Sequence, residues 1–297
     1  MKLAFLFALM FASCTEAPKP SIAILTPTTH PSLEQIEKGF QDTIESTHPG
    51  QYRIVTYNAQ GNKTLMRGEI EKIAREDHAL VFTIGALASQ MTTEVFNKKA
   101  LETPVVFTAV SDPSALASGK HVTGVQQILD FERELDLALQ YKPNIRSILL
   151  VLNPMEPGIA KDGQEVQAIL SQRGISLIPI EVFQTNELIG KVSPFIHNAD
   201  AMIVLKDNTV VSGLDPLIKL CNKAKIPLIA SDLDSPDRGA AFGYGVHEKE
   251  FGVEAAAMAL QILQEKIAAG DIPVRPVSNF TFKVNRDAAI AQGIALQ

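Results

Sequence analysis

The chain has 297 residues with a net charge of −6, and 46% of its residues are hydrophobic while 20% are charged. This composition is typical of a globular protein, and the length favours two domains over a single core. Lys and Arg are scattered along an acidic chain, which argues against a nucleic-acid-binding protein because such proteins cluster cations to neutralise phosphates.

The N-terminus has the layout of an export signal. A short cationic start and a ten-residue apolar stretch lead to small residues before Cys14. The stretch is too short to span a bilayer and lacks the periodicity of a buried helix. The order is typical of a bacterial lipoprotein, although Phe11 stands where an aliphatic residue is more usual. We expect a signal peptide at 1–13, a lipidated Cys14, an extended tether at 14–20, and a body anchored in the cell envelope outside the cytoplasm.

Eight apolar runs of strand length follow, and most lead through a polar tip into a helix-like stretch. They span residues 21–25, 52–57, 79–84, 104–110, 147–152, 176–183, 201–205 and 227–230. Short apolar strands that alternate with helices indicate βαβ units. The sequence therefore predicts an α/β fold with parallel sheets covered by helices on both faces.

The second half of the chain repeats the first. At offsets of 122 to 127 residues, Ile24 corresponds to Val151, Tyr57 to Phe183, Phe82 to Val204, and Phe107 to Ile229. Two copies of one fold predict two Rossmann-like lobes that face each other across a cleft. In such sheets, ligands bind beyond the carboxyl ends of the strands.

The candidate site residues are therefore the segments that follow the strands. In the first half they are His30, the loop of Gly85, Ala86, Leu87, Ala88 and Ser89, and the pair Ser111 and Asp112. In the second half they are Asn153, Glu156, Asp207, Asn208, Thr209, Ser231 and Asp232.

Signatures of enzymes and metal sites are absent from the sequence. There is no G-x-S-x-G nucleophile elbow, no Walker sequence and no H-E-x-x-H pair. Six dispersed His residues and Cys221, the one cysteine besides Cys14, form no recognisable metal cluster. We expect no enzymatic activity, metal or cofactor; a hydrolase or transferase that uses the cleft is the alternative.

Seven stretches in register resemble a known family over nearly the whole chain. They are His30-Pro-Ser-Leu-Glu with Lys38-Gly-Phe, Tyr57-Asn-Ala-Gln-Gly, Pro104-Val-Val-Phe-Thr-Ala-Val-Ser-Asp-Pro, Val122-Thr-Gly-Val, Asp207-Asn-Thr-Val, Ile226-Pro with Ser231-Asp, and Val284-Asn. The chain in this respect is similar to the substrate-binding lipoproteins of ABC importers, in particular to the family that includes the tryptophan and tyrosine binders.

The resemblance implies a type I periplasmic-binding-protein fold whose lobes are joined by three crossovers. The first lobe would then comprise residues 21–125 and about 243–272, and the second 126–242 and about 273–297. The family's lobes close around a solute by a hinge motion. The resemblance further implies an ABC permease and ATPase as partners, and a monomer.

An amino-acid ligand needs donors for its carboxylate. The loop 85–89 follows a buried strand and opens a helix, so its free backbone N–H groups and the helix dipole suit an anion. The alternative is that Ser89 only caps this helix. The family usually has Thr-Pro where Ala86 and Leu87 stand, and this departure leaves the ligand's identity open.

The ammonium group of such a ligand needs an acceptor, and four acidic residues are available, namely Asp112, Glu156, Asp207 and Asp232. Asp207 and Asp232 are the first choices, and Asn208 and Thr209 would add neutral contacts. Asp112 and Asp232 could instead cap the turns that follow them, and His30 could contact the ligand or hold the loop.

Phe107 and Tyr244 are candidates to cover the ligand's side chain, although Phe107 lies within a strand and could belong to the core. The chain has no Trp, which disfavours a sugar because sugar sites favour stacked aromatic rings. The sequence thus predicts an extracytoplasmic receptor that captures a solute, most consistent with an aromatic or hydrophobic amino acid, for an ABC importer. A sensory binding protein that presents its closed form to a membrane kinase or chemoreceptor is the alternative.

Overall fold

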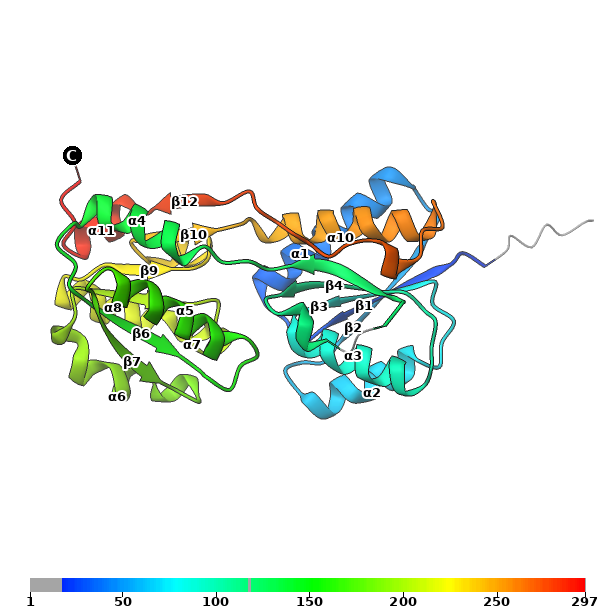
Figure 1. Ribbon diagram of the computed structural model, residues 1–297, viewed down its shortest axis with the longest axis horizontal. Helices are drawn as coiled ribbons and strands as arrows, with labels where there is room; N and C mark the ends of the chain where they lie inside the picture. Colours follow the sequence, from blue (N-terminus) through cyan, green and yellow to red (C-terminus); the bar gives the residue numbers. More distant parts are fainter. Residues whose placement is uncertain (1–17, 117–118, 297) are drawn as a thin grey trace, which may run out of the picture.

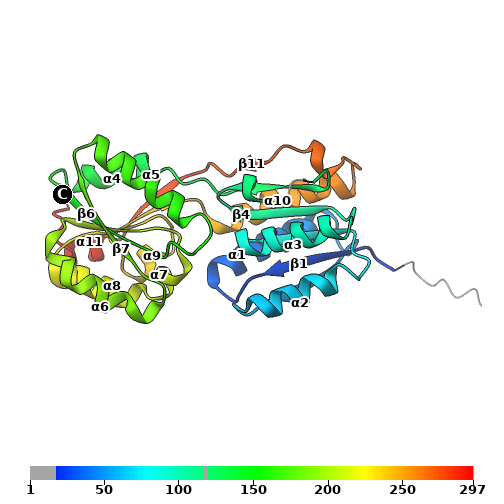
Figure 2. The same cartoon turned by 60° about the horizontal axis from the view of Figure 1, so that its bottom comes forward.

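The computed structural model describes residues 18–116 and 119–296, which fold into two α/β lobes that lie end to end (Figures 1 and 2). The predicted signal peptide and Cys14 lie outside the described residues, as does the tether up to residue 17. Within the described part of the chain, no helix has the length and apolar character needed to cross a membrane. The α/β class and the two lobes predicted from the sequence are confirmed.

The first lobe contains six strands and four longer helices. The strands are β1 (Ser21–Thr26), β2 (Arg53–Asn58), β3 (Leu80–Ile84), β4 (Val105–Val110), β5 (Val122–Gln126) and β11 (Arg275–Pro276). The helices are α1 (Pro31–Thr47), α2 (Lys63–Ile73), α3 (Ala86–Lys98) and α10 (Glu248–Leu263), with short 3-10 turns at η1 (Pro113–Ala115) and η4 (Ala269–Asp271).

The second lobe also has six strands. They are β6 (Ser147–Leu152), β7 (Ser176–Glu181), β8 (Ala201–Val204), β9 (Leu228–Ala230), β10 (Phe242–Gly245) and β12 (Thr281–Val284). Its helices are α4 (Phe131–Tyr141), α5 (Ile159–Gln172), α6 (Leu188–Val192), α7 (Asn208–Ser212), α8 (Leu214–Ala224), α9 (Ser235–Arg238) and α11 (Arg286–Ala291), with 3-10 turns at η2 (Thr185–Glu187) and η3 (Ser193–Asn198).

The two sheets have the same strand order, β11-β5-β4-β3-β1-β2 and β12-β10-β9-β8-β6-β7. The pairs aligned by the sequence repeat fall on or beside equivalent strands; Ile24 and Val151, for example, lie in β1 and β6. Neighbouring strands are parallel, except that β10 and β12 are antiparallel. The sequence did not predict β5, β10, β11 or β12 as strands.

The chain passes between the lobes after β5, after β10 and after β11 (Figure 1). Residues 242–245 pair with β9 and β12 of the second sheet, so the second crossover lies a few residues beyond the expected boundary near 243. Residues 275–276 pair with β5 of the first sheet, so the third crossover lies beyond the expected boundary near 272.

The central strands of each sheet are buried on both faces because nearly all of their residues are apolar. In β1, Ile22 and Ile24 pack under α1 and α10, whereas Ala23 and Leu25 face α2 and α3. The second sheet divides in the same way between α4, α5 and α11 on one face and α6 to α8 on the other. This arrangement positions the loops at the strand ends as rigid parts of each lobe.

Two glycines allow α1 and α10 to cross at unusually short range. A Cβ atom on Gly252 would lie 2.0 Å from the carbonyl oxygen of Ile36, and one on Gly39 would lie 2.3 Å from that of Lys249. Since no side chain fits at either position, the helix crossing fixes the first turns of both helices, which reach the space between the lobes.

A buried carboxyl group in α4 makes the stability of the second lobe depend on pH. Glu134 accepts hydrogen bonds from the hydroxyl of Ser231 at 2.9 and 3.2 Å, and burial raises the pKa of Glu134 from 4.5 to about 8. Between these values the folded state retains a proton that the unfolded state releases. The free energy of unfolding therefore falls as the pH rises through this window.

We expect Glu134→Gln to remove this loss. The variant should match the wild type near pH 5 and exceed its free energy of unfolding by roughly 3 kcal/mol at pH 8.5, measured by urea denaturation at both pH values. Glu165→Gln on the exposed side of α5 is the control and should change little. A Glu134→Gln variant that gains nothing at the higher pH would contradict this explanation.

Candidate functional site

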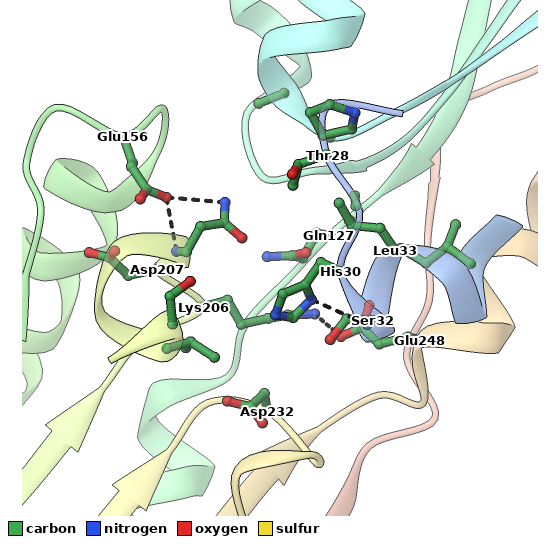
Figure 3. A pocket seen from close by; sticks show the side chains of 18 of the residues that line it. Thr28, His30, Ser32, Leu33, Gln127, Glu156, Lys206, Asp207, Asp232 and Glu248 are labelled. Atoms are coloured by element: carbon green, nitrogen blue, oxygen red, sulfur yellow. Dashed lines mark hydrogen bonds and ion pairs between the residues drawn. The ribbon is translucent and has the colours of Figure 1, made fainter. Parts of the chain in front are cut away.

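A cavity of about 930 Å³ lies between the lobes and is lined by residues of both (Figure 3). Most of its lining comes from the loops that follow β1, β3, β4, β6, β8 and β9 and from the helices that these loops begin. Of the sequence candidates, it is lined by His30, Gly85, Ala86, Leu87, Ser111, Glu156, Asp207, Asn208 and Asp232. The topology thus brings together tips that are far apart in the sequence.

His30 begins α1 on the first-lobe side of the cavity. Its Nδ1 accepts a hydrogen bond of 3.2 Å from the backbone N–H of Ser32, so the imidazole caps the helix. His30 therefore makes the structural hydrogen bond that the sequence offered as the alternative, and it also lines the cavity. Figure 3 shows it beside Ser32 and Gln127, opposite Glu156 and Asp207.

The N-terminus of α3 opens into the cavity without a side-chain cap. Gly85 has a φ of +86°, which glycine adopts readily, and Ala86 and Leu87 follow it along the cavity wall. Because no side chain accepts from the first N–H groups of this helix, they remain available to an anion, aided by the helix dipole.

Ala88 and Ser89 do not belong to the cavity wall. Both are fully buried, and the Ser89 hydroxyl donates to the carbonyl of Gly85 at 2.7 Å and lies 3.0 Å from the hydroxyl of Thr83. The serine thus holds the first turn of α3 against the preceding strand, and only Gly85, Ala86 and Leu87 of this loop line the cavity.

Asp207 is engaged by the protein itself, although it lines the cavity. Its carboxylate accepts hydrogen bonds from the backbone N–H groups of Asn153 and Val210, which ties β6 to the start of α7. Burial, followed by the nearby negative charge of Glu156, raises the pKa of Asp207. Both carboxylate oxygens of Asp207, a first choice for a ligand's ammonium group, therefore already accept from protein donors.

Glu156 and Asp232 are likewise engaged. Glu156 accepts from the backbone N–H groups of Asn208 at 3.0 Å and Thr209 at 2.8 Å. Asp232 accepts from the backbone N–H groups of Asp234 and Ser235, and from the Ser235 hydroxyl. For Asp232 the structure shows the capping role that the sequence left open.

Asp112 also has a capping role and does not line the cavity. It accepts from the backbone N–H and the hydroxyl of Ser114 at the start of η1. Hydrogen bonding by Ser114 and, less strongly, the charge of Lys161 lower the pKa of Asp112. Its oxygen lies 3.5 Å from the Nζ atom of Lys161, so the pair connects the first lobe to the second.

Five further candidates lie outside the cavity wall. Asn153 donates to the hydroxyl of Thr209 at 2.9 Å, Ser231 bonds Glu134, Tyr244 stacks on Phe280 with ring centroids 5.1 Å apart, and Phe107 is buried in the core. Among the described residues, neither Phe nor Tyr lines the cavity. Phe107 thus has the core position that the sequence left open, Tyr244 does not line the cavity, and the apolar wall consists of aliphatic side chains and Met66.

The structure also reveals an ion pair that the sequence did not predict. Lys206 of the second lobe pairs with Glu248 at the start of α10, and both line the cavity (Figure 3). Burial raises the pKa of Glu248, while Lys206 opposes the rise. Glu248 follows the crossover after β10. Had this strand been predicted from the sequence, Glu248 would have been included among the residues at the strand ends.

Two more contacts bring the lobes together at the cavity rim. The hydroxyl of Ser32 donates to Asp234 at 2.9 Å. A Cβ atom on Gly158, at the start of α5, would lie 2.3 Å from the Oγ of Ser111. Across residues 18–116 and 119–296, no group of three or more potential ligands could hold a metal ion.

Comparison with known proteins finds similar proteins over nearly the whole chain. The sequence profile of a family described as ABC transporter substrate binding protein matches residues 21–297. The uncharacterized protein RP367 of Rickettsia prowazekii (strain Madrid E) is 30% identical over 99% of this chain and 92% of its own length. The tyrosine-binding protein of Clostridioides difficile (strain R20291) is 24% identical over 87% of this chain and 76% of its own.

Solved structures share the two-lobed fold. The ABC domain from Streptococcus pneumonia in complex with L-Trp aligns with a TM-score of 0.84 and 24% identity, covering 94% of this chain and 96% of the other. Together with the family match, this likeness confirms the type I periplasmic-binding-protein fold that the sequence resemblance implied.

Proposed function

Because the chain belongs to the ABC transporter substrate-binding protein family, we propose that it captures a hydrophobic or aromatic amino acid between its lobes and delivers it to an ABC permease. The observation that carries the proposal is the cavity between two lobes of this family's fold. It performs no bond chemistry in this role, and its partners are the solute and the permease with its ATPase.

The uncapped N-terminus of α3 supports an amino acid as the solute. Ala86 and Leu87 of its first turn line the cavity, where uncapped backbone N–H groups can donate to a carboxylate. Apolar side chains of the cavity wall can cover a hydrophobic side chain of the solute. They belong to Leu33, Ile36, Met66, Leu87, Ile159 and Val211. The relative named as a tyrosine-binding protein is consistent with this class.

We further propose that Cys14 carries a lipid anchor and that the body acts outside the cytoplasm as a monomer. Substrate-binding proteins of ABC importers work on that side of the membrane, and the order of the first fourteen residues fits a lipoprotein signal. Metabolic labelling with a radioactive fatty acid tests the anchor. Cys14→Ala should lose both the label and the membrane association.

Thermal-shift measurements on the purified chain test the solute class. The chain is first unfolded and refolded to release bound solute, then mixed with each L-amino acid, short peptides and sugars. We expect stabilisation by one or a few hydrophobic amino acids, about 2.7 kcal/mol at a hundredfold excess over the Kd. Stabilisation by sugars or peptides alone would contradict the proposed class.

A further inference from the structure

Seven acidic side chains line the cavity, and six of them already have a protein partner. The six are Glu156, Asp207, Asp232, Asp234, Asp237 and Glu248. The seventh belongs to Asp162, and this carboxyl group has no hydrogen bond or ion pair with any described residue. It is therefore the cavity carboxylate whose lone pairs are not already shared with a protein donor.

The packing of α5 against the core of the second lobe positions Asp162 at the cavity. It lies in the first turn of this helix, between Ile159 and Val166, which pack into the core of the second lobe at helical spacing. Burial, followed by the negative charge of Glu165, raises the pKa of Asp162 to about 6. A carboxylate in such surroundings is ionised at pH 7 and poorly solvated, so a cationic partner would be favourable.

The first turn of α5 approaches the proposed carboxylate site from the opposite lobe. Gly158 at its start packs against Ser111 of the first lobe. Ser111 follows β4, whose Thr108 carbonyl accepts a 2.9 Å hydrogen bond from the N–H of Gly85. The positive end of α3 and the free carboxylate of Asp162 thus belong to the same end of the cavity, as the two charges of an amino acid require.

We propose that Asp162 accepts the ammonium group of the bound solute, so that the cavity selects zwitterionic amino acids over carboxylic acids that lack the amino group. This inference rests on the proposed function and names a residue that determines its specificity. Asp162 is on a helix rather than at a strand tip, which is why the pattern of polar tips did not include it.

Isothermal titration calorimetry of the purified full chain tests the role. The wild type is titrated with the L-amino acids, and the tightest binder is compared with its analogue that lacks the amino group, such as L-leucine with 4-methylpentanoate or L-tyrosine with 3-(4-hydroxyphenyl)propanoate. The loss of a charge-assisted hydrogen bond in Asp162→Asn should weaken amino-acid binding roughly 10- to 100-fold. Binding of the analogue should be unchanged or stronger.

Glu254→Gln is the control, because it removes the same charge from an exposed position of α10 that does not line the cavity. Its affinity should stay within about twofold of the wild type. An acidic residue in a first turn also interacts with the helix dipole, so the melting temperature of each ligand-free variant is measured as well. If Asp162→Asn does not fold, Asp162→Ser provides a second neutral variant for the same comparison.

The outcomes separate this inference from the proposed function. If the wild type binds an amino acid and the folded Asp162 variants bind it equally well, the role of Asp162 is overturned and the proposed function stands. Equal weakening of the amino acid and its analogue would also overturn it, because the effect would not concern the ammonium group. A wild type that binds no amino acid overturns both.

Discussion

Gly252→Ala should destabilise the protein by about 2 kcal/mol or more, because the added methyl group overpacks the crossing of α1 and α10. It would lie 2.0 Å from the carbonyl oxygen of Ile36 and 2.6 Å from the backbone nitrogen of Phe40, and backbone atoms cannot rotate away. The two helices must separate, which displaces His30 and Glu248 at their first turns and so distorts the cavity. Urea denaturation followed by circular dichroism measures the loss.

Gly68→Ala is the control for this effect. Gly68 lies in α2, where an added Cβ atom would meet no other atom within 4 Å. Alanine should therefore stabilise this helix by about 0.5–1 kcal/mol through its higher helix propensity. If Gly252→Ala were as stable as Gly68→Ala, the close crossing of the helices would be contradicted.

Lys206→Met should destabilise the protein by about 3 kcal/mol at pH 8, because it leaves the buried carboxylate of Glu248 without its partner. The Lys206 ammonium also lies 5.3 Å from the centre of the Phe251 ring, an attraction that methionine cannot replace. Since the pKa of Glu248 is already raised by burial and loses its opposing charge in the variant, the cost should shrink at pH 5, where the carboxyl group can remain protonated. Free energies of unfolding at both pH values measure this difference.

The double variant Lys206→Met with Glu248→Gln should recover much of the stability at pH 8, because no buried charge is left unpaired. The pair also joins the second lobe to the start of α10 in the first lobe, so both variants should bind solute more weakly than the wild type. A single variant as stable as the double variant at pH 8 would contradict the coupling between the two side chains.

The sequence predicted the central strands because they are buried on both faces and therefore form continuous apolar runs. β1 and β6 are examples, and their repeat along the chain revealed the two lobes. The strands that it did not predict are shorter or less apolar. β10 is Phe-Gly-Tyr-Gly, and β11 has two residues, Arg275 and Pro276. These strands pair near the sheet edges, and they form because the rest of the sheet offers them a partner. Local periodicity in their own sequences does not predict them.

The candidate site was predicted in outline for a similar reason. Loops at the carboxyl ends of parallel strands meet at one edge of a sheet, so the pattern alone could bring His30 together with Gly85 in the first lobe and Glu156 with Asp207 in the second. The sequence could not assign the partners of the carboxylates, because these come from other elements. Asp207 accepts from backbone groups of two segments, while the carboxyl group of Asp162 on α5 has no partner among the residues that the structure describes.

Mass spectrometry of the solute released from the natively purified chain tests the account most directly. The chain is isolated gently from its own cells, denatured, and the released small molecules are identified and counted against the protein. We predict an amino acid with a hydrophobic or aromatic side chain at close to one molecule per chain. A sugar, or another solute without an amino acid's two charged groups, present in that amount would contradict it.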